Sequence, residues 1–326
     1  MTSLQTAFTR HAGVTVPLIG GAMYPCSNPE LVAAISATGA LGVVQPIALT
    51  YVHGYEFRDG LRYIRRLTDR PIGMNALIEQ SSRHYRQRME RWITVALEEG
   101  VRFFVTSLGN PRWVADRVHA AGGVVYHDVT EARWARKGAD AGVDGLIAVN
   151  ARAGGHAGTR SAEALFEELQ PFGLPLVCAG GVGDARDFAA MLRLGYAACQ
   201  LGTRFIATTE CTASTAYKAA IVDADEADIV LSERITGVPV AVINTPLIRR
   251  MGLKAGPIAR WMLRHRRTKH WMRTIYALQS LWRFKRSLTG DVEYWQAGKS
   301  VRGIRSVEPV DVVVRRFVGE VAGRGS

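Results

Sequence analysis

The chain has 326 residues, a length that suits one large α/β domain or one with a modest insertion. Hydrophobic residues make up 48% and charged residues 21%, which excludes a wholly disordered chain. No apolar run reaches the roughly 18–20 residues of a membrane-spanning helix, and the first residues lack the apolar region of a signal peptide. The cysteines at 26, 178, 199 and 211 form no C-x-x-C pair. We therefore expect reduced thiols in a cytoplasmic protein, with no metal site.

The net charge of +12 comes from one segment of the chain. Between Arg234 and Gly290 there are thirteen Lys and Arg and no acidic residue, so the rest of the chain carries 12 − 13, or −1. A basic surface spread over the whole protein is therefore absent, which makes nucleic acid an unlikely partner.

Short apolar runs alternate with amphipathic stretches over the first 200 residues. The periodicity predicts strands at 14–19, 41–44, 71–77, 103–107, 124–128, 145–149, 174–179 and 198–201. It predicts helices at 29–38, 55–67, 86–99, 111–121, 131–141, 162–169 and 184–194.

This alternation predicts parallel strands joined by crossover helices. The strands are mostly continuous apolar runs, as expected when both faces of a sheet are buried. Eight such strands indicate an α/β fold of the TIM (β/α)8 barrel type. The alternative is an open doubly wound sheet, which would carry G-x-G-x-x-G after its first strand. The sequence there is Gly20-Gly21-Ala22-Met23, which does not match.

The pattern changes after the eighth strand. We expect residues 1–210 to form the barrel, 211–295 a smaller helical and basic cap domain, and 296–326 a segment that returns to the barrel. In detail, we expect 203–223 to be helical, 226–243 irregular and 309–321 a final amphipathic segment. The basic segment 249–286 carries Trp261, Trp271 and Trp282. It suits a solvated helical face, an acidic partner or substrate, or a membrane surface better than nucleic acid.

Glycines follow the seventh and eighth predicted strands. Gly180 and Gly181 end the first of these strands, and Gly202 with Thr203 ends the second. In barrels, the loops after these two strands commonly bind a phosphate through backbone N–H groups, so we expect one here. The alternative is that these glycines only form tight strand-to-helix turns.

Two side chains are candidates for chemistry at the same end of the barrel. His156 follows the sixth strand and is flanked by glycines, which suits an exposed imidazole acting as an acid or base. The alternative is a loop histidine that makes local hydrogen bonds. His127 and Asp128 are neighbours in the fifth strand and point to opposite sides, so they form no dyad. We expect Asp128 to face the mouth of the barrel.

Seven motifs occur in an order that resembles the nitronate monooxygenase family, formerly called 2-nitropropane dioxygenases. They are PLIGGAM, IGMNALI, VTSLGNP, YHDVT, AGGHAG, CAGGVGD and QLGTRFIATTEC. The resemblance runs from about residue 8 to residue 220 and returns in YWQAGKSV. It implies a TIM barrel that binds FMN non-covalently beside a smaller helical substrate domain.

The resemblance also implies roles for individual residues. His156 would be the catalytic histidine, and Asp128 stands where relatives carry a flavin-contacting lysine or glutamine. The implied flavin-binding residues are Ala22, Met23, Asn75, Asp128, Gly155, Ala179, Gly180, Gly181, Gly202 and Thr203.

The implied reaction is the oxidation of a small molecule, an alkyl nitronate, by O2. Many members of the family have arginine at the position of Ala157, so substrate identity does not carry over. The same fold and flavin site serve NADH:quinone reductases and flavin-dependent enoyl-acyl-carrier-protein reductases. NAD(P)H-dependent reduction of a quinone or an enoyl thioester is therefore the alternative activity. The non-enzyme alternative is a flavin-binding scaffold associated with a membrane.

Overall fold

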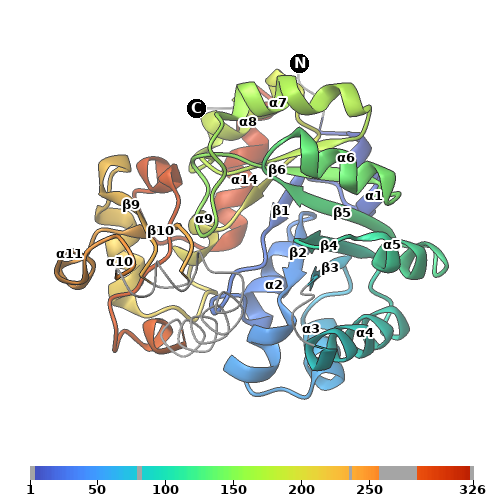
Figure 1. The fold of residues 1–326 in the computed structure, drawn as a ribbon, viewed down its shortest axis with the longest axis horizontal. Coiled ribbons are helices and arrows are strands. Elements are labelled where there is room, and N and C mark those ends of the chain that lie inside the picture. Colours follow the sequence, from blue (N-terminus) through green and yellow to red (C-terminus); the bar gives the residue numbers. More distant parts are fainter. Residues whose placement is uncertain (1–3, 79–82, 235–236, 257–284, 324–326) are drawn as a thin grey trace.

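The computed structural model describes residues 4–78, 83–234, 237–256 and 285–323. Within this part, eight parallel strands close into a barrel in which β8 pairs with β1 (Figure 1). The predicted TIM barrel is thereby confirmed. Its strands are β1 (Leu18–Gly20), β2 (Leu41–Val44), β3 (Ile72–Leu77), β4 (Phe103–Ser107), β5 (Val124–Val129), β6 (Gly145–Val149), β7 (Leu176–Ala179) and β8 (Ala198–Leu201).

Helices surround the barrel and fill most connections between strands. Their first turns follow ordinary capping chemistry: the side chain of Ser161 accepts a hydrogen bond from the N–H of Ala164, and Asp184 accepts one from Asp187. These helices are α1 (Ala7–Ala12), α2 (Pro29–Ala37), α3 (Phe57–Leu67), α4 (Arg83–Glu98), α5 (Arg112–His119), α6 (Ala132–Asp140), α7 (Ala162–Leu169) and α8 (Ala185–Leu194). A π-helical turn at Ala48–Val52 and a 3-10 turn at Gln170–Phe172 complete this part. None of the described helices has the length and apolar character needed to cross a membrane.

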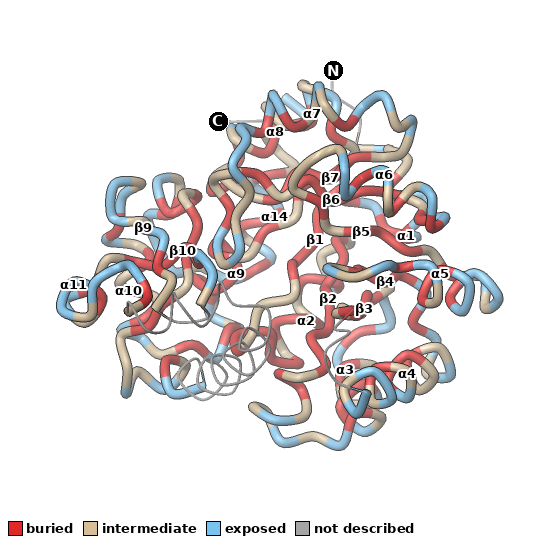
Figure 2. Tube along the Cα trace, viewed as in Figure 1, coloured by how far each residue is buried: buried red, intermediate tan, exposed pale blue. Residues whose placement is uncertain are grey.

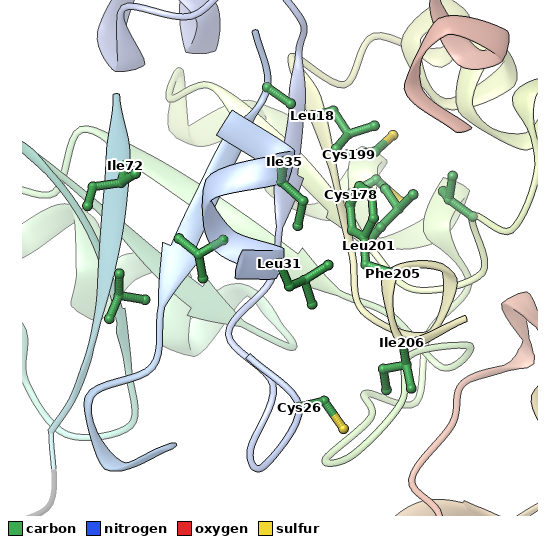
Figure 3. Packing of buried hydrophobic residues seen from close by; sticks show 14 of the residues in the cluster. Leu18, Cys26, Leu31, Ile35, Ile72, Cys178, Cys199, Leu201, Phe205 and Ile206 are labelled. Carbon is green, nitrogen blue, oxygen red and sulfur yellow. The ribbon is translucent and has the colours of Figure 1, made fainter. Parts of the chain in front are cut away.

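The strands bury both faces, as their apolar composition predicts (Figure 2). One face packs against the helices: Leu18, Cys178 and Cys199 lie in the cluster that includes Ile35 of α2 (Figure 3). The other face fills the barrel interior with a separate cluster that includes Ile19 and Val177. All four cysteines are free and buried.

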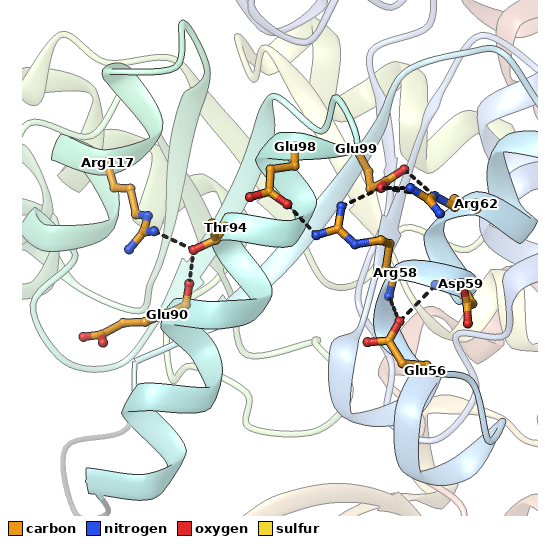
Figure 4. A network of polar contacts seen from close by, with 9 residues as sticks. All are labelled: Glu56, Arg58, Asp59, Arg62, Glu90, Thr94, Glu98, Glu99 and Arg117. Carbon is orange, nitrogen blue, oxygen red and sulfur yellow. Dashed lines mark hydrogen bonds and ion pairs between the residues drawn. The ribbon is translucent and has the colours of Figure 1, made fainter.

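Polar contacts join α3 to α4 on the outside of the barrel (Figure 4). Arg58 pairs with both Glu98 and Glu99, and the Arg62 guanidinium lies 3.0 Å from Glu99. These side chains are partly exposed, so solvent screens their attraction and the pairs contribute little to stability. The network joins α3 to the end of α4.

Two predicted elements differ from the structure by more than the three residues at an end that separate prediction and structure elsewhere in the barrel. The first strand begins at Leu18 and not at residue 14, because the N–H of Val16 bonds to the carbonyl of Gly39 outside the barrel ladder. The predicted helix 203–223 was wrong as one element. It consists of α9 (Thr203–Ile206) and α10 (Thr215–Asp223), because the hydroxyl of Ser214 caps a new helix by accepting from Tyr217.

The region after α10 contains strands that the sequence did not predict. Residues 226–243 include β9 (Ile229–Ser232) and β10 (Val240–Ile243), which pair antiparallel beside a 3-10 turn at Glu226–Asp228. These elements lie with α10 and α11 (Pro246–Met251) on the left of Figure 1. Residues 257–284 of the basic segment, with its three tryptophans, lie outside the described residues.

The last part of the chain packs on the barrel. After a 3-10 turn at Lys299–Gly303, α14 (Val310–Val321) lies against α8 and α2. The rings of Phe317 and Phe188 are 5.4 Å apart at this contact. Residues at the end of the chain therefore complete the helical layer beside the first and last strands.

Candidate functional site

The predicted site residues all lie at the carboxyl end of the barrel strands or in the loops that follow. Ala22 and Met23 follow β1, Asn75 lies in β3 and Asp128 in β5, whereas Gly155 and His156 follow β6. The remaining predicted residues, Ala179, Gly180, Gly181, Gly202 and Thr203, end or follow β7 and β8. Because the strands are parallel, these ends meet on one face of the barrel.

Side chains along β5 point alternately into and out of the barrel, and Asp128 is on the inward side. Tyr126 belongs to the interior cluster, and His127 points outward, where its Nδ1 lies 2.9 Å from the hydroxyl of Thr106. A Cβ at Gly138 of α6 would lie 3.3 Å from the His127 ring, which confirms the outward direction. Asp128 must therefore face inward, two residues above Tyr126. As predicted, His127 and Asp128 form no dyad.

Asp128 is a partly buried residue, and one of its two carboxyl oxygens is fully enclosed. Its Oδ1 is buried and makes no hydrogen bond within the described part of the chain. Burial raises the pKa of Asp128 to about 7, because desolvation disfavours the charged form. Such an uncompensated polar group is costly and marks a position suited to a polar ligand.

Asn75 lies on the same interior surface. It is opposite Val105 in the register of β3 and β4, and Val105 belongs to the interior cluster. Like Asp128, Asn75 is only partly exposed. The upper interior of the barrel thus presents an amide and a carboxyl, whereas its lower interior is apolar.

The glycines after β7 are required by the loop that follows β6. Gly180 and Gly181 have φ of 116° and 82°, in the region that favours glycine. A Cβ at Gly180 would lie 2.5 Å from the Asn150 side chain, and one at Gly181 would lie 2.7 Å from Nε of Arg152. Buried Asn150 also donates to the carbonyl of Gly180 at 2.9 Å. The backbone of the loop after β7 therefore packs against side chains of the loop after β6.

This packing leaves backbone donors free. Across the described residues, the N–H groups of Gly180, Gly181, Gly202 and Thr203 donate no hydrogen bond. The N–H of Gly21 does bond to the carbonyl of Leu201, which ties the start of the β1 loop to the end of β8. Several free N–H groups at adjacent strand ends form a site suited to an anion. The predicted phosphate residues therefore fit a phosphate.

Thr203 is also held by a segment of the chain that follows the eighth strand by almost one hundred residues. The N–H of Gly298 donates to its hydroxyl oxygen at 3.0 Å, and the N–H of Lys299 donates to the carbonyl of Arg152 at 2.9 Å. Since the Thr203 hydroxyl accepts from the protein, its own hydrogen remains available to an anion. The segment around Gly298 is thus a structural part of the site.

His156 stands at the solvent side of the site. Gly155 before it has φ of 69°, and its carbonyl accepts a hydrogen bond from the N–H of Ala241 in β10 at 2.8 Å. His156 is exposed, and surrounding protein lowers the pKa of its imidazole by desolvation. Both observations describe a side chain that reaches solvent on one side. A neutral imidazole can accept a proton near neutral pH.

Sequence reasoning missed two residues of this site. Asn150 and Arg152 lie in the loop after β6 and contact the glycines after β7. A loop arginine and asparagine carry no periodic signal, so only their position directly after a predicted strand could have indicated them. Among the described residues, no group of three or more His, Cys, Asp or Glu side chains could hold a metal ion.

Comparisons with known proteins identify the family of the chain. A sequence model of the nitronate monooxygenase family matches residues 5–282. A Rhodococcus jostii (strain RHA1) protein, (3aS,4S,5R,7aS)-5-hydroxy-7a-methyl-1-oxo-octahydro-1H-indene-4-carboxyl-CoA dehydrogenase, is 31% identical over 249 residues, covering 76% of this chain and 68% of that protein.

Solved structures are similar over nearly the whole chain. FabK from Thermotoga maritima has a TM-score of 0.80 at 26% identity and covers 98% of this chain and 97% of its own. The nitroalkane oxidase from Streptomyces ansochromogenes has a TM-score of 0.78 at 25% identity, with 98% and 99% covered. The barrel fold and the family match identify a flavin-dependent oxidoreductase, and the chain belongs to the nitronate monooxygenase family.

Proposed function

We propose that the protein binds FMN and uses it to oxidise alkyl nitronates with O2 in the cytoplasm. The observation that carries this proposal is the set of free N–H groups at Gly180, Gly181, Gly202 and Thr203, which suits the phosphate of FMN. FMN, when bound, supplies the electron transfer that side chains cannot perform. FAD is less well supported, because the sequence has no dinucleotide fingerprint.

The residues of the chain have separate roles in this proposal. Ala22, Met23 and Asn75 lie at the ends of strands that would flank the flavin ring. Asp128, with its pKa raised to about 7, is largely protonated in mildly acidic solution and can then donate a hydrogen bond to a ring or substrate oxygen. Gly155 and Ala179, which have no bulky side chains, would let the backbone approach the ring.

His156 would act on the substrate. Its exposed, neutral imidazole can take the proton from the carbon next to a nitro group, which converts a nitroalkane into its nitronate. With a substrate that is already a nitronate, the same ring can hydrogen-bond to a nitronate oxygen. The family match and the similarity to a nitroalkane oxidase support this substrate class.

A second substrate class is favoured by one comparison. The Rhodococcus relative at 31% identity is named a dehydrogenase of a CoA thioester. The thirteen basic residues between Arg234 and Gly290 provide positive charge for the phosphates of such a substrate, or for an acidic partner or membrane surface. The alternative activity is therefore oxidation or NAD(P)H-dependent reduction of an acyl thioester.

Two measurements test the proposal. Acid release of the cofactor followed by chromatography should give FMN, and adenine in the released material would contradict it. Anaerobic mixing of the oxidised protein with a nitronate should bleach the flavin absorbance, and admission of O2 should restore it. Fast bleaching by NADH or NADPH, with no response to nitronates, would instead support the reductase. No response to any of them would leave a flavin-binding protein without either activity.

A further inference from the structure

Arg152 lies directly over one of the two glycines that follow β7. Its Nε and Cδ would be 2.7 Å and 2.9 Å from a Cβ placed at Gly181. The backbone N–H of Arg152 donates to Oδ1 of Asn150 at 2.8 Å, and the carbonyl of Arg152 accepts from Lys299. Both bonds fix the main chain of this residue. The start of its side chain is therefore fixed beside Gly181, whose N–H is free for an anion.

One carboxylate orients the far end of the same side chain. The two terminal nitrogens of Arg152 bind the two carboxylate oxygens of Glu226, with 3.2 Å between Nη1 and Oε2. A forked pair of this kind fixes the plane of a guanidinium as well as its position. Both bonds to Glu226 use the terminal nitrogens, so the Nε–H nearest to Gly181 is not engaged by that carboxylate.

The charge around this pair is not balanced by Glu226 alone. Arg302 also contacts Glu226, with 3.3 Å between its Nε and Oε1, and reaches Asp187 at 3.3 Å. Asp187 accepts in addition from the N–H of Gly183. Glu226 is thus shared by two arginines, and Asp187 is shared by Arg302 and a backbone donor of the glycine loop. An anion at Gly181 would give the Nε–H of Arg152 a partner that Glu226 does not supply.

We infer that Arg152 is the cationic contact for the phosphate of the flavin, and that Glu226 holds it in position. The inference rests on the proposed binding of FMN and adds a side chain to a site otherwise made of backbone N–H groups. A charge-assisted hydrogen bond to phosphate distinguishes FMN from riboflavin, which has the same ring system and no phosphate. Arg152 therefore determines the preference of the protein for the phosphorylated cofactor.

Titration of the full-length protein, freed of flavin, with FMN and with riboflavin tests this inference. Quenching of flavin fluorescence gives both dissociation constants. Arg152→Met should weaken FMN binding by about 10- to 100-fold and leave riboflavin binding within about twofold, because a hydrogen bond to a charged group is worth about 1.5–3 kcal/mol. Arg152→Lys keeps the charge but not the forked geometry, so its dissociation constant for FMN should lie between those of the wild type and Arg152→Met.

Arg160 offers a matched control in the same loop. It pairs with Glu168 at 2.7 Å, and no contact joins it to the glycines after β7 among the described residues. Arg160→Met should therefore leave both dissociation constants unchanged. Thermal unfolding of each variant shows whether the fold is intact, and Arg152→Lys serves if Arg152→Met does not fold.

Three outcomes overturn the inference. Equal weakening of FMN and riboflavin would make Arg152 a structural residue of the loop, and unchanged FMN binding would exclude the contact. A wild-type protein that binds riboflavin as tightly as FMN would show that no cation acts on the phosphate. The proposed reaction fails separately: if nitronates do not reduce the flavin but the FMN preference depends on Arg152, the inference stands and the substrate assignment falls.

Discussion

Polar groups have hydrogen-bond partners at one end of the barrel interior and lack them at the other, among the described residues. At the amino end, the ring of Tyr126 packs 4.9 Å from that of Phe103, and its hydroxyl lies 3.1 Å from Nδ1 of His11. Two residues further along the same strand, Asp128 is partly buried and has one buried oxygen without a partner among the described residues. One end is closed by packing, and the other keeps unused hydrogen-bonding groups. Substitutions at the two ends should therefore change different properties.

The largest effect is expected at the carboxyl end of the barrel, which we call the open end. It concerns the rate of flavin reduction and not the stability of the fold. His156→Asn should lower the rate of flavin reduction by a neutral nitroalkane by about 10²–10⁴, the usual contribution of a positioned acid or base. Anaerobic stopped-flow absorbance measures it. The loss should be smaller with the preformed nitronate, which needs no proton removal.

The control for this substitution is His119→Asn at the end of α5, where the ring pairs with Asp144. That variant should keep the wild-type rate. If His156→Asn retains full activity on both forms of the substrate, His156 is a loop residue without a role in the reaction.

The next effect is expected at the closed end, on stability. Phe103 is 2% exposed and contacts the rings of Phe8 and Tyr126. Phe103→Ala should lower the free energy of unfolding by about 3–5 kcal/mol, because it leaves a cavity in the packed interior. Urea denaturation followed by circular dichroism measures the change. A loss below 1 kcal/mol would mean that the lower interior does not stabilise the barrel.

The pH dependence of stability provides a further test of the open end, at Asp128. Its folded pKa of about 7 lies above the unfolded value of about 3.9, so ionisation favours the unfolded state. In the flavin-free protein, this residue should lower stability progressively as pH rises from about 4 to about 7. Asp128→Asn should thus change stability little at pH 4 and raise it by about 2–4 kcal/mol at pH 8.

Urea titrations at both pH values check this dependence. The exposed residue Asp116 offers the matched control, Asp116→Asn. If the gain of Asp128→Asn is the same at pH 4 and pH 8, the carboxyl is not desolvated in the folded protein.

The smallest effect is expected at the rim of the open end. Leu108, directly after β4, has φ of 62° and is 59% exposed. The left-handed region costs a leucine about 1–2 kcal/mol, so Leu108→Gly should raise stability by about 0.5–1 kcal/mol after the entropy of glycine is subtracted.

Leucine-to-glycine substitution at an exposed position in a helix should lower stability instead of raising it. Leu67, the last residue of α3, is 46% exposed, and Leu67→Gly should lower stability by up to about 1 kcal/mol. Differential scanning calorimetry compares the two variants. A lower melting temperature for Leu108→Gly would show that the leucine side chain contributes more than its backbone costs.

The sequence predicts the barrel well because its strands are buried on both faces and read as uninterrupted apolar runs. The strand β9 was missed because Ile229, Val230 and Leu231 are only partly buried or exposed, so no inside–outside alternation is visible. Alternation did place Asp128 on the inner face. Its lack of a partner, however, depends on side chains from other strands, which no local pattern contains.

The role of Arg152 shows the same limit. In the sequence it is one arginine among 41 basic residues, and nothing near it in the chain indicates a buried neighbour. Its position is defined by Gly181, 29 residues later, and by Glu226 beyond the eighth strand. Site residues defined by such distant contacts become visible only in the folded structure.

The contacts of Gly298 have a consequence for biosynthesis. All eight strands are complete by Leu201, yet Thr203 and Arg152 receive hydrogen bonds from Gly298 and Lys299, which follow Leu201 by almost one hundred residues. On the ribosome, at roughly 5–20 residues per second, the barrel can emerge several seconds before the segment that completes its mouth. A nascent chain would thus hold a closed barrel with an unfinished cofactor site, and capture of flavin would follow the arrival of that segment.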